Sequence, residues 1–176
     1  TGMSLNEAVA LIKGPKGTQV RLLVKREGEP EPLEFVITRD TITVPVLDYR
    51  MLDQAAGIGY IQLYEFSKKG AADQVREAIA DLRSQGMTRL IFDVRQNPGG
   101  LLDEVVEIAS LFLPTGDPVV HIVERGKEQR ALTAREAEPW DLPLVVLIDG
   151  GSASASEILA GAVKDAGVGT LIGEKT

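Results

Sequence analysis

The sequence predicts a layered α/β domain that follows a smaller N-terminal segment. From Gly57 onward, strand-like and helix-like stretches alternate, which is typical of βαβ units around a mainly parallel sheet. One strand candidate, 142–148, is nearly all apolar, as expected of a central strand covered on both faces. Two glycine-rich loops each follow a buried strand and precede a helix, the place where such sheets bind their ligands.

Composition and charge exclude several classes of function. The chain has 176 residues, of which 44% are hydrophobic and 26% charged, as in ordinary globular proteins. Its net charge of −7 disfavours nucleic acid or an anionic lipid surface as a partner. With no cysteine and one histidine, thiolate and multi-histidine metal sites are excluded. No motif for a metal or a cofactor is singled out, and we expect neither. No apolar stretch approaches the roughly 20 residues of a membrane span.

The first 40 residues predict one short helix and one hairpin. Ser4 and Glu7 are spaced as a capping box, so the helix should begin there and end near Gly14. The segments 20–24 and 33–37 alternate apolar and polar residues on either side of a turn, which predicts two paired strands.

So small a set of elements cannot build a stable core alone. Residues 1–40 are therefore expected to be the end of a larger domain, and residues 41–176 to form a second one. The boundary should fall between Thr38 and Val44.

The second domain is predicted from periodicity and breakers. Apolar residues recur at helical spacing in 71–84, and Gly86 ends that pattern. The polar stretch 124–140 is expected to be a long excursion from the core that could flank a cleft. The predicted order is strand 58–66, helix 71–84, strand 90–94, helix 101–113, strand 118–123, strand 142–148, helix 156–166 and strand 170–172.

The loop after strand 142–148 is crowded with small residues and contains Ser154. A serine at a strand-to-helix turn is well placed to attack a carbonyl, and the amide of Ala155 could stabilise the oxyanion that develops. The alternative is that Ser154 and Glu157 are only an N-terminal capping box, the commoner meaning of this spacing.

The loop after strand 90–94 contains Gly99 and Gly100. Glycine lets the backbone approach a ligand closely, so the amide of either residue is a candidate second oxyanion donor. An ordinary Pro-Gly turn is the alternative.

Three segments together resemble the signatures of the carboxyl-terminal processing peptidases of bacteria and chloroplasts, also called tail-specific proteases. They are 93–100 (DVRQNPGG), 151–158 (GSASASEI) and 173–176 (GEKT), in the family's order. The resemblance extends to the first 40 residues, which are similar to the second half of a PDZ domain. It implies that the rest is a peptidase core with an α/β superhelical fold similar to crotonase and Clp-type proteins.

The resemblance also implies a Ser-Lys mechanism, in which a poorly solvated neutral lysine takes the proton of the serine. Ser154 matches the nucleophile, and the amides of Ala155 and of the Gly99–Gly100 turn match the oxyanion hole. The flanking serines 152 and 156 are expected to be structural. Asp165 matches an aspartate for which a supporting role is conceivable, although a solvated carboxylate at a helix end is the simpler interpretation.

The family's catalytic lysine follows the segment matched by 173–176, so we expect the base to lie beyond Thr176. Lys175 occupies the variable position of that segment and is a poor substitute. The first half of the PDZ domain would likewise precede Thr1. Without its base, the chain as given is expected to be inactive.

The leading hypothesis is a serine endopeptidase that cleaves protein or peptide substrates at their C-terminal tails. A homo-oligomer or a regulatory protein partner is left open, and the resemblance suggests the bacterial cell envelope as location. A non-catalytic binding or scaffolding module is the main alternative. A crotonase-like acyl-CoA enzyme would leave the serine motif and the PDZ-like start unexplained. His121 is expected to be structural, Trp140 to be packed, and 135–141 to be a solvated loop.

Overall fold

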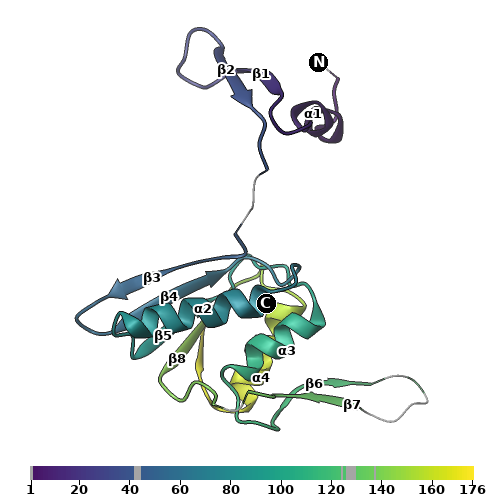
Figure 1. Cartoon of the computed structure of the whole chain (residues 1–176). Helices are drawn as coiled ribbons and strands as arrows, with labels where there is room; N and C mark the ends of the chain where they lie inside the picture. Colours follow the sequence, from purple (N-terminus) through teal and green to yellow (C-terminus); the bar gives the residue numbers. More distant parts are fainter. Residues whose placement is uncertain (1, 42–44, 124, 126–129, 137) are drawn as a thin grey trace. The chain divides into compact units, whose positions relative to one another are not determined.

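The structure is a computed structural model that describes residues 2–41, 45–123, 125, 130–136 and 138–176 (Figure 1). The chain divides into two compact units, Thr1–Val44 and Pro45–Thr176. Part of the predicted boundary region, residues 42–44, lies outside the described residues.

The first unit contains the predicted helix and hairpin, namely α1 (Leu5–Ile12), β1 (Gln19–Val24) and β2 (Leu33–Thr38). The capping box forms, because Ser4 N–H donates to Glu7 Oε2 (2.8 Å) and Glu7 N–H donates to Ser4 Oγ (3.3 Å). At the other end of α1, the Arg39 guanidinium donates to the carbonyls of Leu11 and Ile12. This cation joins the end of the hairpin to the C-terminus of the helix.

No described residue of the first unit is buried. Helix α1 has no buried side chain, and apolar residues such as Leu5 and Leu11 are 81% and 63% exposed. The unit therefore has secondary structure without a core of its own, as the sequence led us to expect of so short a segment.

The second unit is built on a five-stranded sheet in the order β3-β4-β5-β8-β9. Its strands are β3 (Leu47–Asp53), β4 (Ile58–Leu63), β5 (Arg89–Asp93), β8 (Leu144–Ile148) and β9 (Thr170–Gly173). Strand β3 pairs antiparallel with β4, and the remaining pairs are parallel. The sequence pattern did not predict β3, whose side chains are mostly exposed because it is an edge strand.

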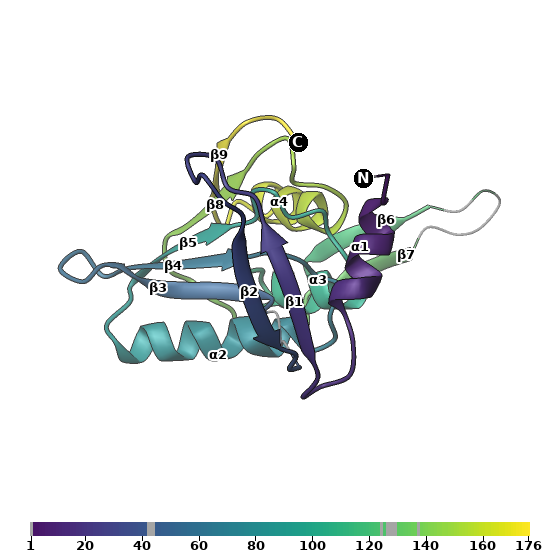
Figure 2. The same ribbon diagram turned by 90° about the horizontal axis from the view of Figure 1, so that it is seen from above.

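Helices α2 (Ala71–Ser84), α3 (Leu102–Ser110) and α4 (Ala155–Asp165) connect these strands (Figure 2). Successive parallel strands advance across the sheet in one direction, so right-handed crossovers place all three helices on the same face. Burial agrees with this arrangement, since Leu144 and Val146 of β8 are buried whereas Val145 and Leu147 are only half-buried. The expectation that β8 is covered on both faces is therefore wrong for the described residues.

The core lies between the sheet and the helices. Phe92 of β5 meets Phe112, just beyond α3, edge to face, with 5.5 Å between ring centroids. Trp140 is buried in the same core, as predicted, and the Arg83 guanidinium lies 5.3 Å from its ring centroid.

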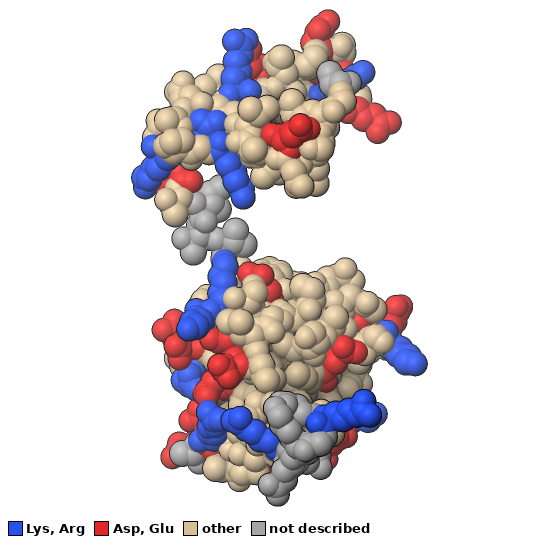
Figure 3. Space-filling model, turned by 90° about the vertical axis from the view of Figure 1, so that its right-hand side faces the viewer, with Lys and Arg blue, Asp and Glu red and all other residues tan. Residues whose placement is uncertain are grey.

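Between α3 and β8 the chain forms a hairpin of β6 (Pro118–Ile122) and β7 (Arg130–Thr133) that projects from the helices (Figures 1 and 2). Strand β7 falls in the predicted polar excursion, of which residues 124, 126–129 and 137 lie outside the described residues. On the face shown in Figure 3, basic and acidic side chains occur near one another.

No helix in the described part of the chain has the length and apolar composition needed to cross a bilayer. Among the same residues, no group of histidine and acidic side chains is placed to hold a metal ion.

Candidate active site

The two glycine-rich turns lie against one another at the carboxyl ends of β5 and β8. These strands are parallel neighbours, with Asp93 opposite Leu147, so the loops that follow them leave the same edge of the sheet. Gly99 is so close to the serine turn that a Cβ on it would lie 2.8 Å from Ser154 Cβ and 2.9 Å from Ala155 N. The structure therefore brings together Ser154, Ala155 and the Gly99–Gly100 turn.

Ser154 lies at the sharpest point of its turn. It is exposed, and its backbone has φ 54° and ψ −112°, a conformation that non-glycine residues rarely adopt. Such strain is common where a serine is presented at a strand-to-helix turn. The Ser154 N–H donates to the Glu157 carboxylate (2.8 Å), as in a capping box, so the capping and the catalytic interpretations are compatible.

The backbone N–H groups of the two turns differ in whether they already have a hydrogen-bond acceptor. Ala155 is the first residue of α4, so its N–H has no carbonyl partner within the helix. The Gly99 N–H donates to Asn97 Oδ1 (2.9 Å) and is already occupied. Gly100 is exposed, and no described residue accepts a hydrogen bond from its N–H. Of the two predicted glycines, Gly100 therefore has the available donor.

Gly100 has this position because its backbone runs beside the segment after β4. Phe66 N–H donates to Gly99 O (2.8 Å), and Leu101 N–H donates to Phe66 O (2.9 Å). A Cβ on Gly100, whose φ is +150°, would lie 2.3 Å from the Phe66 carbonyl carbon, so only glycine fits here.

Buried polar groups support both turns. Asn97 was not singled out from the sequence, yet it is fully buried, and its Nδ2 donates to Leu63 O (2.8 Å). Ser152 Oγ donates to Val94 O (2.8 Å), and Ser156 Oγ donates to Asn97 O (2.9 Å). The two flanking serines are thus structural, as predicted.

A second network fixes the end of β5 just before the glycine turn. Asp93 is fully buried, accepts from Tyr60 Oη (2.6 Å) and forms an ion pair with Arg95 (2.6 Å). Burial opposes the charge of Asp93, but hydrogen bonds from Arg95 and Tyr60 outweigh it and lower the pKa of the carboxyl group. The charged network therefore persists at neutral pH.

Three other residues considered from the sequence lie apart from Ser154 or on the surface. Asp165 is exposed at the far end of α4, about 15 Å along the helix at 1.5 Å per residue. His121 is an exposed residue of β6, across from α4. Lys175 is exposed, and its carbonyl oxygen lies 3.9 Å from the position that a Cβ would take on Gly150. The structure does not bring Asp165 to the two turns.

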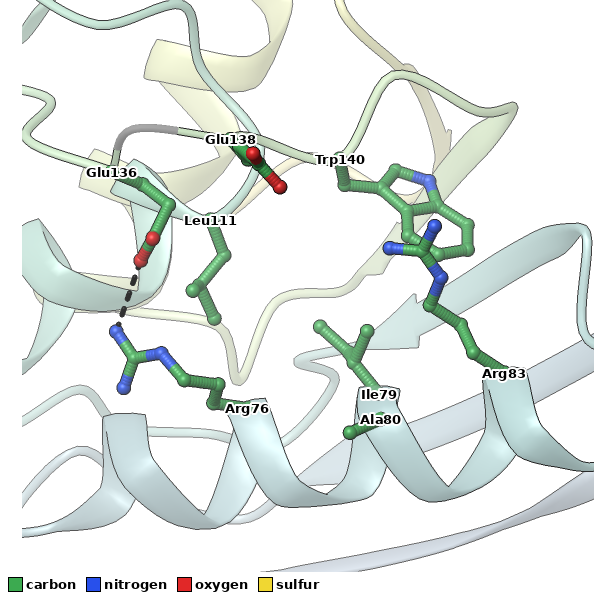
Figure 4. A pocket seen from close by; sticks show the side chains of 8 residues that line it. All are labelled: Arg76, Ile79, Ala80, Arg83, Leu111, Glu136, Glu138 and Trp140. Carbon is green, nitrogen blue, oxygen red and sulfur yellow. Dashed lines mark hydrogen bonds and ion pairs between the residues drawn. The ribbon is translucent and has the colours of Figure 1, made fainter.

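A separate hollow of about 190 Å³ lies between α2 and the segment that leads into β8 (Figure 4). Arg76 and Arg83 rise from α2, and Arg76 pairs with Glu136 (3.2 Å) across the hollow. Trp140 forms its opposite wall. This hollow is at the amino end of β8, whereas Ser154 follows its carboxyl end, so it is not part of the candidate site. The predicted solvated loop is thus partly anchored, through Glu136 and Trp140.

Known proteins resemble the chain in both sequence and structure. Residues 57–176 match the family model "Peptidase family S41". The "Carboxyl-terminal-processing protease" of Synechocystis is 43% identical over 99% of the chain and 41% of its own length. The "Carboxy-terminal processing protease CtpA" of Bacillus subtilis is 37% identical over 99% of the chain and 37% of its own length.

Among solved structures, the "Photosystem II D1 C-terminal processing protease" matches with a TM-score of 0.65 and 29% identity, over 97% of the chain and 47% of that protein. The chain therefore spans about two fifths of the length of the curated relatives it matches. The family model covers more than half of the chain and the sequence relatives align with nearly all of it, so the chain belongs to peptidase family S41 and is homologous to the C-terminal processing proteases.

Proposed function

We propose that this chain carries the nucleophile and oxyanion hole of a serine endopeptidase that cleaves proteins near their C-termini. The single observation that carries the proposal is the contact between the two turns, which holds Ser154 beside the Gly99–Gly100 backbone. The names of the relatives in Synechocystis and Bacillus subtilis support the substrate class, protein tails.

In the proposed mechanism, Ser154 Oγ attacks the carbonyl carbon of the scissile peptide bond and its proton passes to a base. The negative charge that develops on the carbonyl oxygen is stabilised by the N–H groups of Ala155 and Gly100, which have no acceptor among the described residues. Collapse of this intermediate expels the amine and leaves an acyl ester on Ser154, which water then hydrolyses.

The base of this proposal is a lysine beyond Thr176, as the resemblance implies. The carboxylate of Glu157 lies beside Ser154, but it accepts from the Ser154 N–H as part of the capping box of α4. His121 belongs to β6 and Asp165 to the far end of α4. Lys175 follows β9 beside Gly150, but its side chain is exposed and lacks the poorly solvated surroundings that the proposed mechanism asks of its base. The 176-residue chain alone is accordingly proposed to be inactive, and the bacterial cell envelope is proposed as the location of the whole protein.

The test is tail cleavage by the full-length protein. Ser154→Ala should abolish cleavage of a protein with an unstructured C-terminal tail while leaving the unfolding midpoint unchanged. Retained cleavage would remove Ser154 from the mechanism. If the full-length protein has no lysine within a few residues after Thr176 and does not cleave, the chain is instead a binding or scaffolding module with a peptidase fold.

A further inference from the structure

Asp149 stands between the two turns of the candidate site. It follows β8 directly and was not singled out by the sequence patterns, because a lone aspartate after a strand is common at turns. Its Oδ1 accepts from the backbone N–H of Gln96 (2.9 Å), and its Oδ2 accepts from Gln96 Nε2 (2.7 Å). One carboxylate thus accepts hydrogen bonds from both the backbone and the side chain of a residue 53 positions earlier in the chain.

The same carboxylate also shapes its own loop. Asp149 Oδ1 accepts from Gly151 N–H (2.9 Å), and Asp149 N–H donates to Ser152 Oγ (3.0 Å). Asp149 is therefore bonded to the serine turn on one side and, through Gln96, to the glycine turn on the other.

The backbone of both partners is adapted to this contact. Gln96 has φ +58°, which is unfavourable for a residue with a side chain, and in this conformation its N–H reaches Asp149. A Cβ on Gly151 would lie 2.7 Å from Gln96 Nε2 and 2.9 Å from Gln96 Cα. Such close approach of two loops, with a strained backbone at Gln96 in one and at Ser154 in the other, is expected where surrounding bonds impose the geometry.

We propose that Asp149 is a positioning residue that sets the separation of the oxyanion donor Gly100 from the nucleophile Ser154. The inference rests on the proposed function, because the separation matters only if both groups act on one carbonyl. Asp149 touches neither the substrate nor the reacting atoms and acts through Gln96 and the two turns. Its ionised state gives it acceptor oxygens on both sides of the contact.

A role of Asp149 confined to its own turn predicts a different result when the residue is removed. If Asp149 only closes its own turn through Gly151, its removal should leave the other contacts between the loops intact. One of them is the bond from Ala153 N–H to Asn97 O (3.1 Å), which does not involve Asp149. Hydrogen exchange at Ala153 therefore separates the two roles without any measurement of activity.

The experiment compares Asp149→Ala with Asp149→Asn in the full-length protein. Asparagine keeps an acceptor oxygen for the N–H groups of Gln96 and Gly151, whereas alanine keeps none. We expect Ala153 exchange to become at least tenfold faster in Asp149→Ala and to stay within threefold of wild type in Asp149→Asn. The N–H of Val94, bonded to Leu147 O within the sheet, is the internal control and should not change.

Kinetics give the second measurement. Displacement of reacting groups by about 1 Å can lower the rate about 100-fold. We therefore expect the kcat of Asp149→Ala to fall about 100-fold while its KM stays within about threefold of wild type. The kcat of Asp149→Asn should stay within about fivefold of wild type. Asp141→Ala, an exposed aspartate three positions before β8, is the matched control and should retain wild-type kcat.

Unchanged Ala153 exchange in a folded Asp149→Ala protein would overturn the inference, and so would an unchanged kcat. If Asp149→Ala does not fold, Asp149→Ser keeps a hydroxyl for its own turn but has no second oxygen that can hold the backbone and side chain of Gln96. Unchanged Ala153 exchange and an unchanged kcat in that variant would equally overturn the inference. Cleavage that persists in Ser154→Ala would instead refute the proposed function. The exchange rate of the Ala153 N–H would still decide whether Asp149 holds the two turns together.

Discussion

The contact between the two turns makes a quantitative prediction for Gly99→Ala. A Cβ at this position would lie 2.7 Å from Ala153 O, 2.8 Å from Ser154 Cβ and 2.9 Å from Ala155 N. Two of these three atoms are backbone and the third is a Cβ, so none is the free end of a flexible side chain. Gly99 also has φ +100°, which any other residue adopts with strain.

Gly116→Ala isolates the steric part of the effect. Gly116 has a similar φ of +91°, but a Cβ there would meet no atom within 4 Å. Both variants should lose about 1–3 kcal/mol through backbone strain. Gly99→Ala should lose roughly 1–3 kcal/mol more, the usual cost of inserting a methyl group into a packed site.

The assay is urea unfolding of the 176-residue chain followed by the fluorescence of Trp140. Trp140 is the chain's one tryptophan and is buried in the second unit, so its signal reports on the unit that contains both glycines. With an m value of about 2 kcal/mol/M, the two variants should differ by about 1 M in midpoint. Equal midpoints would show that the two turns are not in contact and would refute the reasoning behind the candidate site.

Three further predictions follow from single side chains. His121→Gln should leave the rate of tail cleavage by the full-length protein within about twofold of wild type, because His121 is exposed on β6 and substitutions of exposed residues usually have small effects. A loss of activity as large as that of Ser154→Ala would revive a histidine-based mechanism. Trp140→Ala should destabilise the second unit by about 3–5 kcal/mol in thermal or urea unfolding, since the ring is buried in the core; a loss below 1 kcal/mol would contradict its assignment to the core. Hydrogen bonds from the side chain and backbone of Gln96 lower the pKa of Asp149 from 3.8 to about 2, so its stabilising effect is present above pH 4 and is lost as the pH falls toward 2. In acid titrations the stability of Asp149→Asn should therefore fall less than that of wild type between pH 4 and 2, and parallel curves would contradict the assignment.

Some features were missed because their sequence signals are weak. Strand β3 was not predicted, since an edge strand with exposed side chains lacks the clear alternation of a half-buried strand. Strand β7 lies in a polar stretch and, among the described strands, pairs with β6 alone, so its conformation depends on that partner. The side chain of Asn97 bonds to Leu63 O and to the Gly99 N–H, and that of Asp149 bonds to Gln96 in the other turn. The bonds to Leu63 and to Gln96 join distant parts of the chain, so no local pattern reveals them.

The sequence by itself determined the elements whose signals are local, such as the capping box at Ser4 and the helix of 71–84, and it determined the family through its three motifs. Helical periodicity and turn residues act over a few positions, so they can be read without knowing the fold. Only the tertiary structure decided that Gln96 meets Asp149, that Asn97 occupies the Gly99 N–H, and that Gly100 is left as the available donor. These contacts exist because β5 and β8 are neighbours in the sheet, and strand order is a property of the whole fold.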